Sequence, residues 1–532
     1  MKKLISHSLG VPFMVVTVFL GCQDLDVVNQ NQPDEQRALA SPGDLESLIK
    51  GSFLSWFDAI QSSTPNMSLA MPSDTYTCGW GNFGMGSLST EPREVLINTS
   101  SSGLRGVLNG PWFGLYGAIS AATDGIRNIE AGNVSLGDDN ERALGFAKLV
   151  QGLSHGYIAL MFDKGFVLDE SVDLASGTLE LIPYKDVMDA AIKQLEAAIV
   201  IFKANNFTLP ADWINGKAYT SAELAQLAHS FIARYMALLP RDKAARAAVN
   251  WSSVLTNLDN GLTEDWGVMG DGAGRGSIWY SGTHWYSSQW NVWQRVDYKL
   301  IGPSDESTGY SDWLAKAPAD RDEFIMESGD KRIWDGTLAA NGTQNPGTQM
   351  LQIGQTTFIR ASYGFSRYGH DRFKAVTTSN NAVPIVLFRM SENDFLRAEA
   401  LMHTGGSNGA IAGLLDKTHV NDGGYPSTAS LALGSINDAP NPRNDDGATL
   451  WSVLKYEKNM DLLGTWSGLQ YWEKRGWGEL TTGTLIHFPV PAADLETMGL
   501  QLYTFGGVGL PGGAPKRRSE IGEDLSEWNL RY

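Results

Sequence analysis

Residues 388–401 read FRMSENDFLRAEAL, and this stretch decides the fold class of the chain. It favours a helix from Ser391 to His403, because alanine, leucine, glutamate and arginine are strong helix formers and no proline interrupts them. Glycines and polar residues follow at 405–409, and a second helix-forming stretch covers 410–418. Two helices joined by a short glycine-rich turn are typical of a helical hairpin.

Apolar residues recur at helical spacing in several other parts of the chain, so more than one such hairpin is expected. The predicted helices are 44–61, one that begins at Pro111, 141–162, one that begins at Pro183, 221–239, 244–258 and 448–463. Small residues such as Ala147 and Gly152 would let neighbouring helices approach closely. Helix pairs of this kind stack in tetratricopeptide-like arrays, where several copies bury one continuous core.

The segment 261–382 differs from the rest, because it is rich in Gly, Ser, Asp, Trp and Tyr and lacks long helical periodicity. We therefore predict a mainly α fold of tetratricopeptide-like helical hairpins with long loop-rich insertions and few short strands. Its expected parts are N-terminal repeats over 35–260, an aromatic insertion over 261–382, and further repeats with a closing segment over 383–532. We expect all three in one domain that spans 22–532.

The N-terminus carries the features of an export signal. Lys2 and Lys3 precede a mostly apolar run that ends at Leu20, which predicts a signal peptide over 1–21. Cys22 follows a glycine at the end of that run and resembles the lipobox cysteine of bacterial lipoproteins, which implies cleavage before Cys22 and its lipidation. The stretch QDLD at 23–26 resembles the surface-export signal of Bacteroidetes lipoproteins. No later apolar run could cross a bilayer, so contact with the membrane is expected through lipid alone.

The acidity of the chain limits the classes of partner. The formal net charge is −18 at pH 7. Nucleic-acid binding requires clustered lysine and arginine side chains that neutralise phosphates, so nucleic acid is excluded as a partner. We expect the ligand to be neutral or cationic.

Several segments, taken in order, resemble those of the SusD/RagB family of nutrient-binding outer-membrane lipoproteins. The segment 41–53 resembles the entry helix of that family, and WFGLYGAI at 112–119 resembles its next helix. The stretch 388–401 resembles its Arg-Tyr-Ala-Glu signature, and FPVPAADL at 488–495 resembles its closing segment. The resemblance implies a helical repeat scaffold with loop insertions, exposed at the cell surface on the outer membrane. It also implies a SusC-type TonB-dependent transporter as partner.

Two strings match catalytic motifs by their letters, but neither lies between the elements of secondary structure that its motif requires. The string GWGNFG at 79–84 matches a dinucleotide motif, but no βαβ unit surrounds it. The string GGSNG at 405–409 matches a nucleophile elbow, but it lies between two helices. The histidines lack the spacing of metal ligands, so we predict no catalytic residue, no cofactor and no bound transition metal. Acidic runs at 138–141 and 444–447 could hold a structural Ca²⁺, although such runs are more often solvated turns or helix caps.

Aromatic residues in polar loops are the best candidates for a ligand site. Sugars present C–H faces that pack on aromatic rings, while neighbouring polar groups bind the hydroxyls. In the related family the ligand contacts come from such loops. The predicted ligand-binding residues are Trp80, Asn82, Trp279, Trp285, Tyr286 and Trp290. The alternative is that these aromatics pack the insertion against the helices.

We therefore expect a surface lipoprotein, not an enzyme, that binds a nutrient and delivers it to the transporter. An oligosaccharide is the expected nutrient. One alternative is a surface glycoside hydrolase, which requires two carboxylates in the aromatic cleft. Another is a protein-interaction scaffold without a small ligand, in which the aromatic insertion would be buried or lie in an interface.

Overall fold

The structure is a computed structural model of the chain, and it describes residues 41–79, 81–173, 179–289, 293–354, 366–445, 447–509 and 516–517. The predicted signal peptide and Cys22 lie outside these residues. Nowhere in the described ranges does a helix combine the length and the apolar character that a membrane span requires.

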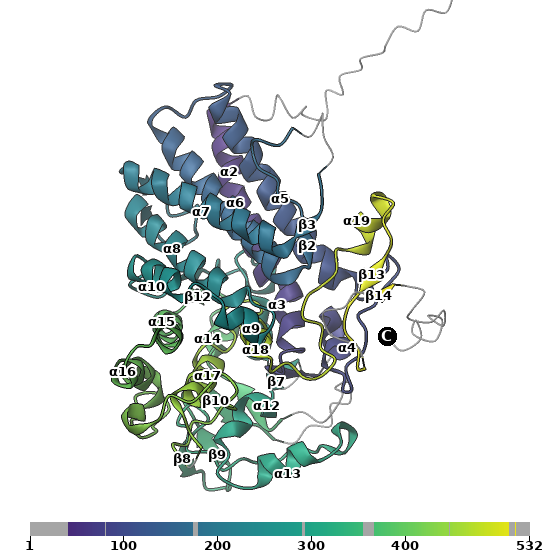
Figure 1. The fold of residues 1–532 in the computed structure, drawn as a ribbon, viewed down its shortest axis with the longest axis vertical. Coiled ribbons are helices and arrows are strands. Elements are labelled where there is room, and N and C mark those ends of the chain that lie inside the picture. The colour runs from purple at the N-terminus through teal and green to yellow at the C-terminus, as the bar shows by residue number, and fades with distance from the viewer. Residues whose placement is uncertain are drawn as a thin grey trace, which may run out of the picture.

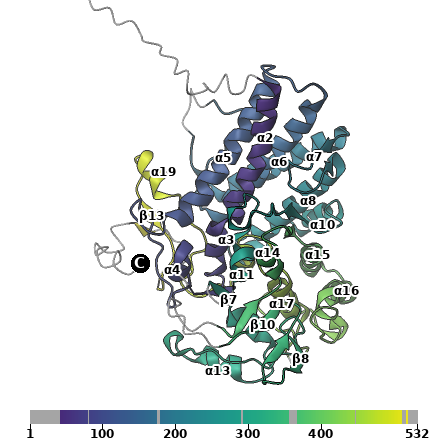
Figure 2. The ribbon, with the colours of Figure 1, turned by 180° about the vertical axis from the view of Figure 1, so that it is seen from behind.

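The N-terminal repeats form a stack of helices that follows the order of the chain. The helices are α2 (Pro42–Gln61), α5 (Arg105–Glu130), α6 (Asn140–Met161), α7 (Tyr184–Ala204), α8 (Ser221–Leu238) and α10 (Trp251–Asp259). After α2, which packs against both α5 and α6, each helix contacts the next one in the list. Figures 1 and 2 show this stack, in purple to teal, from opposite sides. The predicted antiparallel helix pairs are confirmed.

Local sequence explains where two of these helices begin. Ser41 precedes Pro42, and its side chain accepts a hydrogen bond from the Asp44 amide at 3.2 Å. At α8, Thr220 and Glu223 form a reciprocal capping box. Both arrangements satisfy amides that a helix start leaves without an intrahelical partner.

Two predicted helix boundaries are wrong. Pro111 does not start a helix but lies inside α5, which begins at Arg105. The helical turn that precedes Pro111 is kept because the buried side chains of Val107 and Leu108 pack in the core. This packing offsets the loss of the hydrogen bond that proline cannot make. The predicted helix 244–258 is two helices, α9 (Lys243–Ala247) and α10, and Asn250 caps the second.

Glycines let the long helices of the stack approach closely. A Cβ atom on Gly152 of α6 would lie 2.6 Å from a side-chain carbon of Leu195 on α7. A Cβ atom on Gly156 would lie 2.1 Å from the ring of Tyr235 on α8. Both distances are shorter than van der Waals contact, so these helices can pack at this separation only because both positions lack a side chain.

The C-terminal repeats continue the stack with a different kind of contact. They comprise α15 (Met390–Thr404), α16 (Asn408–His419), α17 (Leu450–Asp461) and α18 (Leu469–Trp477), drawn in green to yellow in Figure 1. Helix α15 ends at Gly405 in the left-handed conformation with φ 78°, and α16 packs back against it, as predicted. Two of the three acids in the stretch 388–401, Glu392 and Glu399, are buried. Glu392 pairs with Arg234 of α8 at 2.6 Å, and Glu399 pairs with Arg246 of α9 at 2.7 Å.

The insertion consists of short elements joined by loops. Its strands and helices are β6 (Trp266–Met269), α11 (Gly282–Ser287), β7 (Gln294–Val296), α12 (Tyr298–Ile301), α13 (Gly309–Ala315), β8 (Trp334–Leu338), β9 (Gln344–Pro346), β10 (Met350–Gln352), β11 (Tyr368–His370), α14 (Lys374–Thr378) and β12 (Pro384–Phe388). The strands form two-stranded antiparallel sheets, which confirms the expected few short strands. Side chains of the insertion, including Trp266 and Tyr298, are buried in the same hydrophobic core as the helices.

Two long-range pairings bring distant loops together. The N-terminal strand β1 (Tyr76–Cys78) pairs with β7 of the insertion, and Cys78 lies opposite Gln294. The closing segment runs beside residues 93–98, where Val95 forms a bridge with Gly506. It contains α19 (Ala492–Thr497) and β13 (Tyr503–Thr504), and Figure 1 shows both in yellow beside the N-terminal part of the chain. These pairings place the loop after β1 against two other parts of the molecule.

Candidate functional site

The loop after β1 forms one wall of a cavity of about 490 Å³, which we call the Phe83 cavity. Its other walls come from residues 93–107, which lead into the first turn of α5, and from residues 483–485 of the closing segment. Asn82 and Phe83 both line it. A cavity of this size with mixed polar and apolar walls is typical of a small-ligand site.

The backbone of the loop is held in an unusual conformation at Phe83. A 3₁₀ turn at Asn82–Gly84 leads into α4 (Met85–Ser89), and Phe83 has a φ of 57°, which bulky residues rarely adopt. The following Gly84 has a φ of 73°, and a Cβ atom there would lie 2.6 Å from Val107. Ser68 donates a hydrogen bond to the Phe83 carbonyl at 2.6 Å and fixes the turn. Strained conformations of this kind are concentrated at functional sites.

An aromatic cluster supports the Phe83 wall. The ring of Phe83 lies 5.9 Å from that of Tyr286 and 6.2 Å from that of Trp293, with an angle of 29° between the Phe83 and Trp293 planes. Tyr286 and Trp293 are 4.5 Å apart. Tyr286 is buried, and its hydroxyl accepts a hydrogen bond from Arg275 at 3.2 Å. The pairing of β1 with β7 explains this juxtaposition, since the Gly79 amide donates to the Trp293 carbonyl at 2.7 Å.

The structure brings only some of the predicted site residues together. Asn82 is exposed and lines the cavity, and Tyr286 lies behind Phe83. Trp279 is 7% exposed and packs on Phe57 of α2 with ring centroids 5.2 Å apart.

The remaining predicted residues are not placed at the cavity. Trp285 is also 7% exposed and lies 6.3 Å from the ring of Tyr280. Protein therefore covers both Trp279 and Trp285 in this conformation, as in the packing alternative, and their contact with a ligand stays a prediction. Trp80 and Trp290 lie outside the described residues.

A buried ion pair fixes the wall opposite the aromatic cluster. Arg93 lines the cavity and donates to Asp74 at 2.6 Å, to Thr484 at 3.1 Å and to the Leu88 carbonyl at 3.1 Å. Burial alone would raise the pKa of Asp74, but the positive charges of Arg93, Lys299 and Lys474 outweigh it and lower that pKa to about 2. Arg93 therefore joins three segments of the chain, which gives the cavity a rigid, pre-formed wall.

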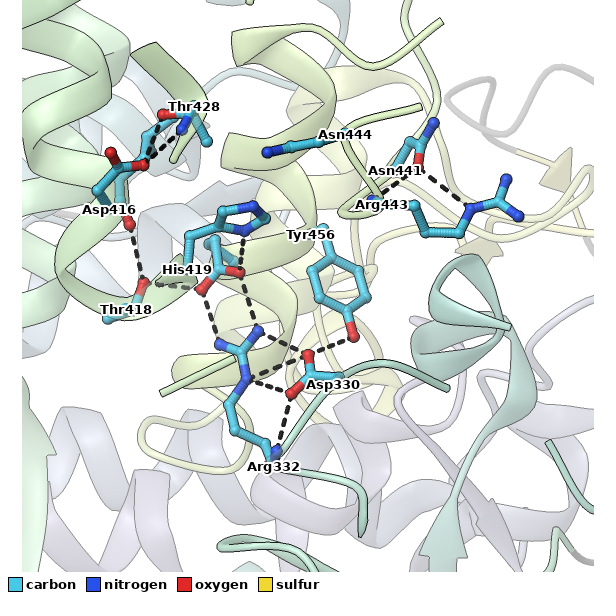
Figure 3. A network of polar contacts seen from close by, with 12 residues as sticks. Asp330, Arg332, Asp416, Thr418, His419, Thr428, Asn441, Arg443, Asn444 and Tyr456 are labelled. Atoms are coloured by element: carbon cyan, nitrogen blue, oxygen red, sulfur yellow. Dashed lines mark hydrogen bonds and ion pairs between the residues drawn. The ribbon is translucent and has the colours of Figure 1, made fainter. Parts of the chain in front are cut away.

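Two features of the structure bear on the hydrolase alternative. Among the described residues that line the Phe83 cavity, Glu94 is the only carboxylate, whereas glycoside hydrolysis in general uses a pair. A histidine–carboxylate pair exists elsewhere, with His419 Nδ1 3.1 Å from Glu457 Oε1. Both side chains are fully buried, and Glu457 also accepts two hydrogen bonds from Arg332, at 2.7 and 2.9 Å (Figure 3). The charges of this pair are satisfied within the protein, so its role is structural.

The acidic runs make contacts typical of turns and caps. Asp139 precedes α6 and pairs with Arg142 at 2.9 Å, while Asp445 pairs with Arg443 at 3.2 Å. Over the part of the chain that the structure describes, no cluster of three or more His, Cys, Asp or Glu side chains is arranged to hold a metal ion. The suggested Ca²⁺ stays a prediction.

Comparison with known proteins identifies structures that share this fold. No family model and no curated protein sequence matches the chain. Solved structures do match over most of their length. A SusD superfamily protein from Bacteroides vulgatus aligns with a TM-score of 0.54 at 13% identity, and the match covers 86% of this chain and 97% of that one. One from Bacteroides thetaiotaomicron aligns with a TM-score of 0.51 at 15% identity, covering 86% and 96%.

A third aligned structure is of a protein that is named for its function. Surface glycan-binding protein A from Bacteroides uniformis aligns with a TM-score of 0.51 at 13% identity, covering 85% of this chain and 98% of that one. At these identities the matches establish architecture, and they confirm the expected helical repeat fold. The chain has the fold of the SusD superfamily.

Proposed function

We propose that the protein is a SusD/RagB family surface lipoprotein that binds an oligosaccharide and delivers it to a SusC-type TonB-dependent outer-membrane transporter. The Phe83 cavity is the observation that supports the binding step most directly, because it combines an aromatic wall, polar groups and a rigid backbone. One of the aligned structures, from Bacteroides uniformis, is of a surface glycan-binding protein. The anchoring step is supported by the sequence around Cys22.

The proposed ligand contacts are Asn82 for hydroxyl groups and the ring of Phe83 for a sugar face. Tyr286 and Trp293 hold that ring in place from behind. Trp80 immediately precedes the loop, and Trp290 lies three residues before Trp293 in the sequence, so both remain proposed members of the site. The protein binds its ligand without cleaving it, because the described residues that line the cavity include one carboxylate rather than a pair.

A glycan array followed by calorimetry tests the binding step, using the chain without residues 1–22. We expect at least one oligosaccharide to bind and to be recovered intact by mass spectrometry. Phe83→Ala should weaken binding by about tenfold, since loss of an aromatic stacking contact costs about 0.5–1.5 kcal/mol in addition to the loss of buried apolar area. Phe113→Ala is the matched control, because Phe113 is 47% exposed on α5 and does not line the cavity.

The outcomes separate the three candidate functions. Cleaved products would replace the proposal with a hydrolase. Absence of binding to any glycan, together with stable association with a transporter, would favour a protein-interaction scaffold. Equal affinities of the Phe83→Ala and Phe113→Ala variants would remove the Phe83 cavity as the ligand site.

The anchoring and delivery steps need the full-length protein. Mass spectrometry of chain extracted from membranes should find acyl groups on Cys22, and Cys22→Ser should move the protein to the soluble fraction. A tagged chain co-expressed with a SusC-type transporter from the same organism should purify with that transporter in detergent. Soluble wild-type protein would contradict the anchor, and separate elution would contradict the partnership.

A further inference from the structure

A second cavity of about 880 Å³ lies next to the Phe83 cavity, and we call it the Asn459 cavity. Its walls come from α12 and α13, from loop residues 437–443 and Gly447, from Asn459 of α17, and from residues 474–481. The Asp74–Arg93 ion pair separates the two spaces, because Asp74 lines this cavity and Arg93 lines the other. Of the predicted site residues that the structure describes, none lines the Asn459 cavity.

Asn459 carries an unused hydrogen-bond acceptor. It is 2% exposed, and its side-chain oxygen has no hydrogen-bond partner in the described protein. Buried polar atoms are almost always paired, because an unpaired one costs about 1–3 kcal/mol. An unpaired oxygen on the wall of a cavity therefore points to a donor that arrives with a ligand.

Most of the acids that line the cavity are already saturated by protein donors. Asp438 accepts from the Ser435 amide at 2.9 Å and from Thr449 at 2.8 Å. Asp305 accepts from the amides of Tyr310 and Glu327 at 2.8 and 2.9 Å.

The other two acids are also engaged. Asp74 binds Arg93 and Thr481, and Glu479 binds Lys455. These carboxylates contribute little free acceptor capacity to a ligand.

The hydrogen-bonding groups that remain available to a ligand are mainly donors. Lys474 is buried and donates to the Ser73 carbonyl at 2.7 Å, which is the one hydrogen bond its ammonium makes within the described residues. Arg443 uses Nε on Asp445 and Nη1 on the Asp305 carbonyl at 3.1 Å, which leaves Nη2 for another acceptor. Figure 3 shows Arg443 with Asn441, apart from the buried network around Arg332. Lysine and arginine donors of this kind bind carboxylates strongly.

Tyr310 adds an aromatic wall to the same space. Its ring lies 6.3 Å from that of Trp313, nearly parallel at 21°, and Tyr310 lines the cavity. An aromatic ring beside hydroxyl and amide groups suits a sugar ring. The volume is within the range of small-ligand sites.

We propose that the Asn459 cavity is a second ligand site that takes a hexuronic acid, a sugar that carries one carboxylate. Lys474 and Arg443 bind the carboxylate, Asn459 accepts from a hydroxyl, and Tyr310 packs on the ring. The net negative charge of the chain does not forbid this ligand, because exposed charges beyond about 8–10 Å are largely screened at physiological salt. The inference does not depend on which ligand occupies the Phe83 cavity.

Calorimetry of the chain with D-galacturonate and D-glucuronate, each compared with its neutral counterpart galactose or glucose, tests this site. We expect each acid to bind about tenfold or more tightly than its neutral counterpart, since a hydrogen bond to a charged group contributes about 1.5–3 kcal/mol. Arg443→Gln should remove most of that advantage. Arg397→Gln should leave it intact, because Arg397 pairs with Asp259 elsewhere on the surface.

A second variant tests the cavity without changing Arg443. Asn459→Leu fills the position with an apolar side chain of similar size and should weaken the acids and the neutral sugars alike. Urea unfolding of each variant confirms that it is folded. Absence of binding by both acids at millimolar concentration would overturn the proposal. Equal affinities for acid and neutral sugars, or an unchanged preference in Arg443→Gln, would overturn it as well.

Discussion

In the N-terminal repeats, α6 meets α7 and α8 through glycines that face leucine and tyrosine side chains. In the C-terminal repeats, carboxylates of α15 and α18 face an arginine of α9 and a lysine of α17. Glu399 and Glu473 each contact both Arg246 and Lys458, and all four side chains are buried. The same helical stack is thus held first by close apolar packing and then by buried charge.

The difference should appear in how each half responds to mutation. Apolar packing fails gradually, because neighbouring side chains adjust to small changes in volume. A buried charge network fails abruptly, because removal of one partner leaves the opposite charge without compensation. The mutations below measure that contrast.

The largest effect is expected at the centre of the charge network. Glu399→Gln keeps the shape of the side chain but leaves Arg246 and Lys458 with one carboxylate between them. We expect the free energy of unfolding to fall by about 3–5 kcal/mol, measured by urea denaturation. A loss below about 1 kcal/mol would show that the network adds little beyond packing.

Acid should first weaken the regions that bury a neutral histidine, which are α6 with His155 and the insertion with His284 and His370. Burial lowers the pKa of His155 on α6 to about 4, and its Nε2 accepts from the Leu168 amide at 3.2 Å, which requires a neutral ring. The unfolded chain binds this proton near pH 6.5, so the contribution is complete above that pH and is lost as pH falls towards 4. The expected loss from His155 is about 2 kcal/mol at pH 5.

The C-terminal half should respond at lower pH. Burial alone would raise the pKa of Glu457, but Arg332 and His419 lower it to about 2. Its stabilisation is therefore present above about pH 4.5 and is lost as pH falls towards 2. Urea unfolding at pH 7, 5 and 3.5 separates the two windows. His155→Gln should reduce the loss of stability between pH 7 and 5, to which buried His284 and His370 also contribute, and should leave the second window unchanged. The same loss between pH 7 and 5 in this variant as in the wild-type protein would contradict the assignment.

A smaller effect is expected from the apolar contacts. Gly156→Ala places a methyl group against the ring of Tyr235 and should cost about 1–3 kcal/mol, measured by thermal and urea unfolding. Gly117→Ala is the matched control on α5, because Gly117 is exposed and no atom lies within 4 Å of its added Cβ. The control should gain up to about 1 kcal/mol from helix propensity. Equal responses at both sites would mean that α6 and α8 do not need their close approach.

The smallest effect is expected from an exposed ion pair. Arg397 donates to Asp259 at 2.7 Å, but the two side chains are 30% and 60% exposed. Arg397→Gln should change the free energy of unfolding by less than about 1 kcal/mol. A loss comparable with that of Glu399→Gln would show that burial is not what distinguishes the network.

The contrast also explains which helices could be predicted from the sequence. Apolar stripes revealed α2, α6, α7 and α8, because hydrophobic periodicity reports a face that packs on apolar neighbours. Helix α18 reads LQYWEKRGW and escaped prediction, since its charged residues look solvent-exposed in the sequence yet are buried against opposite charges. The start of α5 was predicted wrongly at Pro111, because tertiary packing of the preceding turn outweighed the preference of proline for a helix start.

The candidate site was predicted in part for a related reason. The Gly-rich loop after Cys78 indicated Asn82, which lines the cavity. The meeting of Phe83 with Tyr286 and Trp293 depends on the pairing of β1 with β7, residues about 220 apart in the sequence, and no local pattern reports it. Burial of Trp279 against α2 depends on tertiary contacts in the same way.

Hydrogen–deuterium exchange of the chain, with and without a saturating oligosaccharide that binds it, tests the proposed ligand site most directly. We expect slower exchange in peptides that cover 81–107, 293–296 and 483–485, with little change elsewhere, and an oligosaccharide that is recovered intact. Protection confined to other segments, or cleavage of the oligosaccharide during the measurement, would contradict a capture protein whose site is the Phe83 cavity.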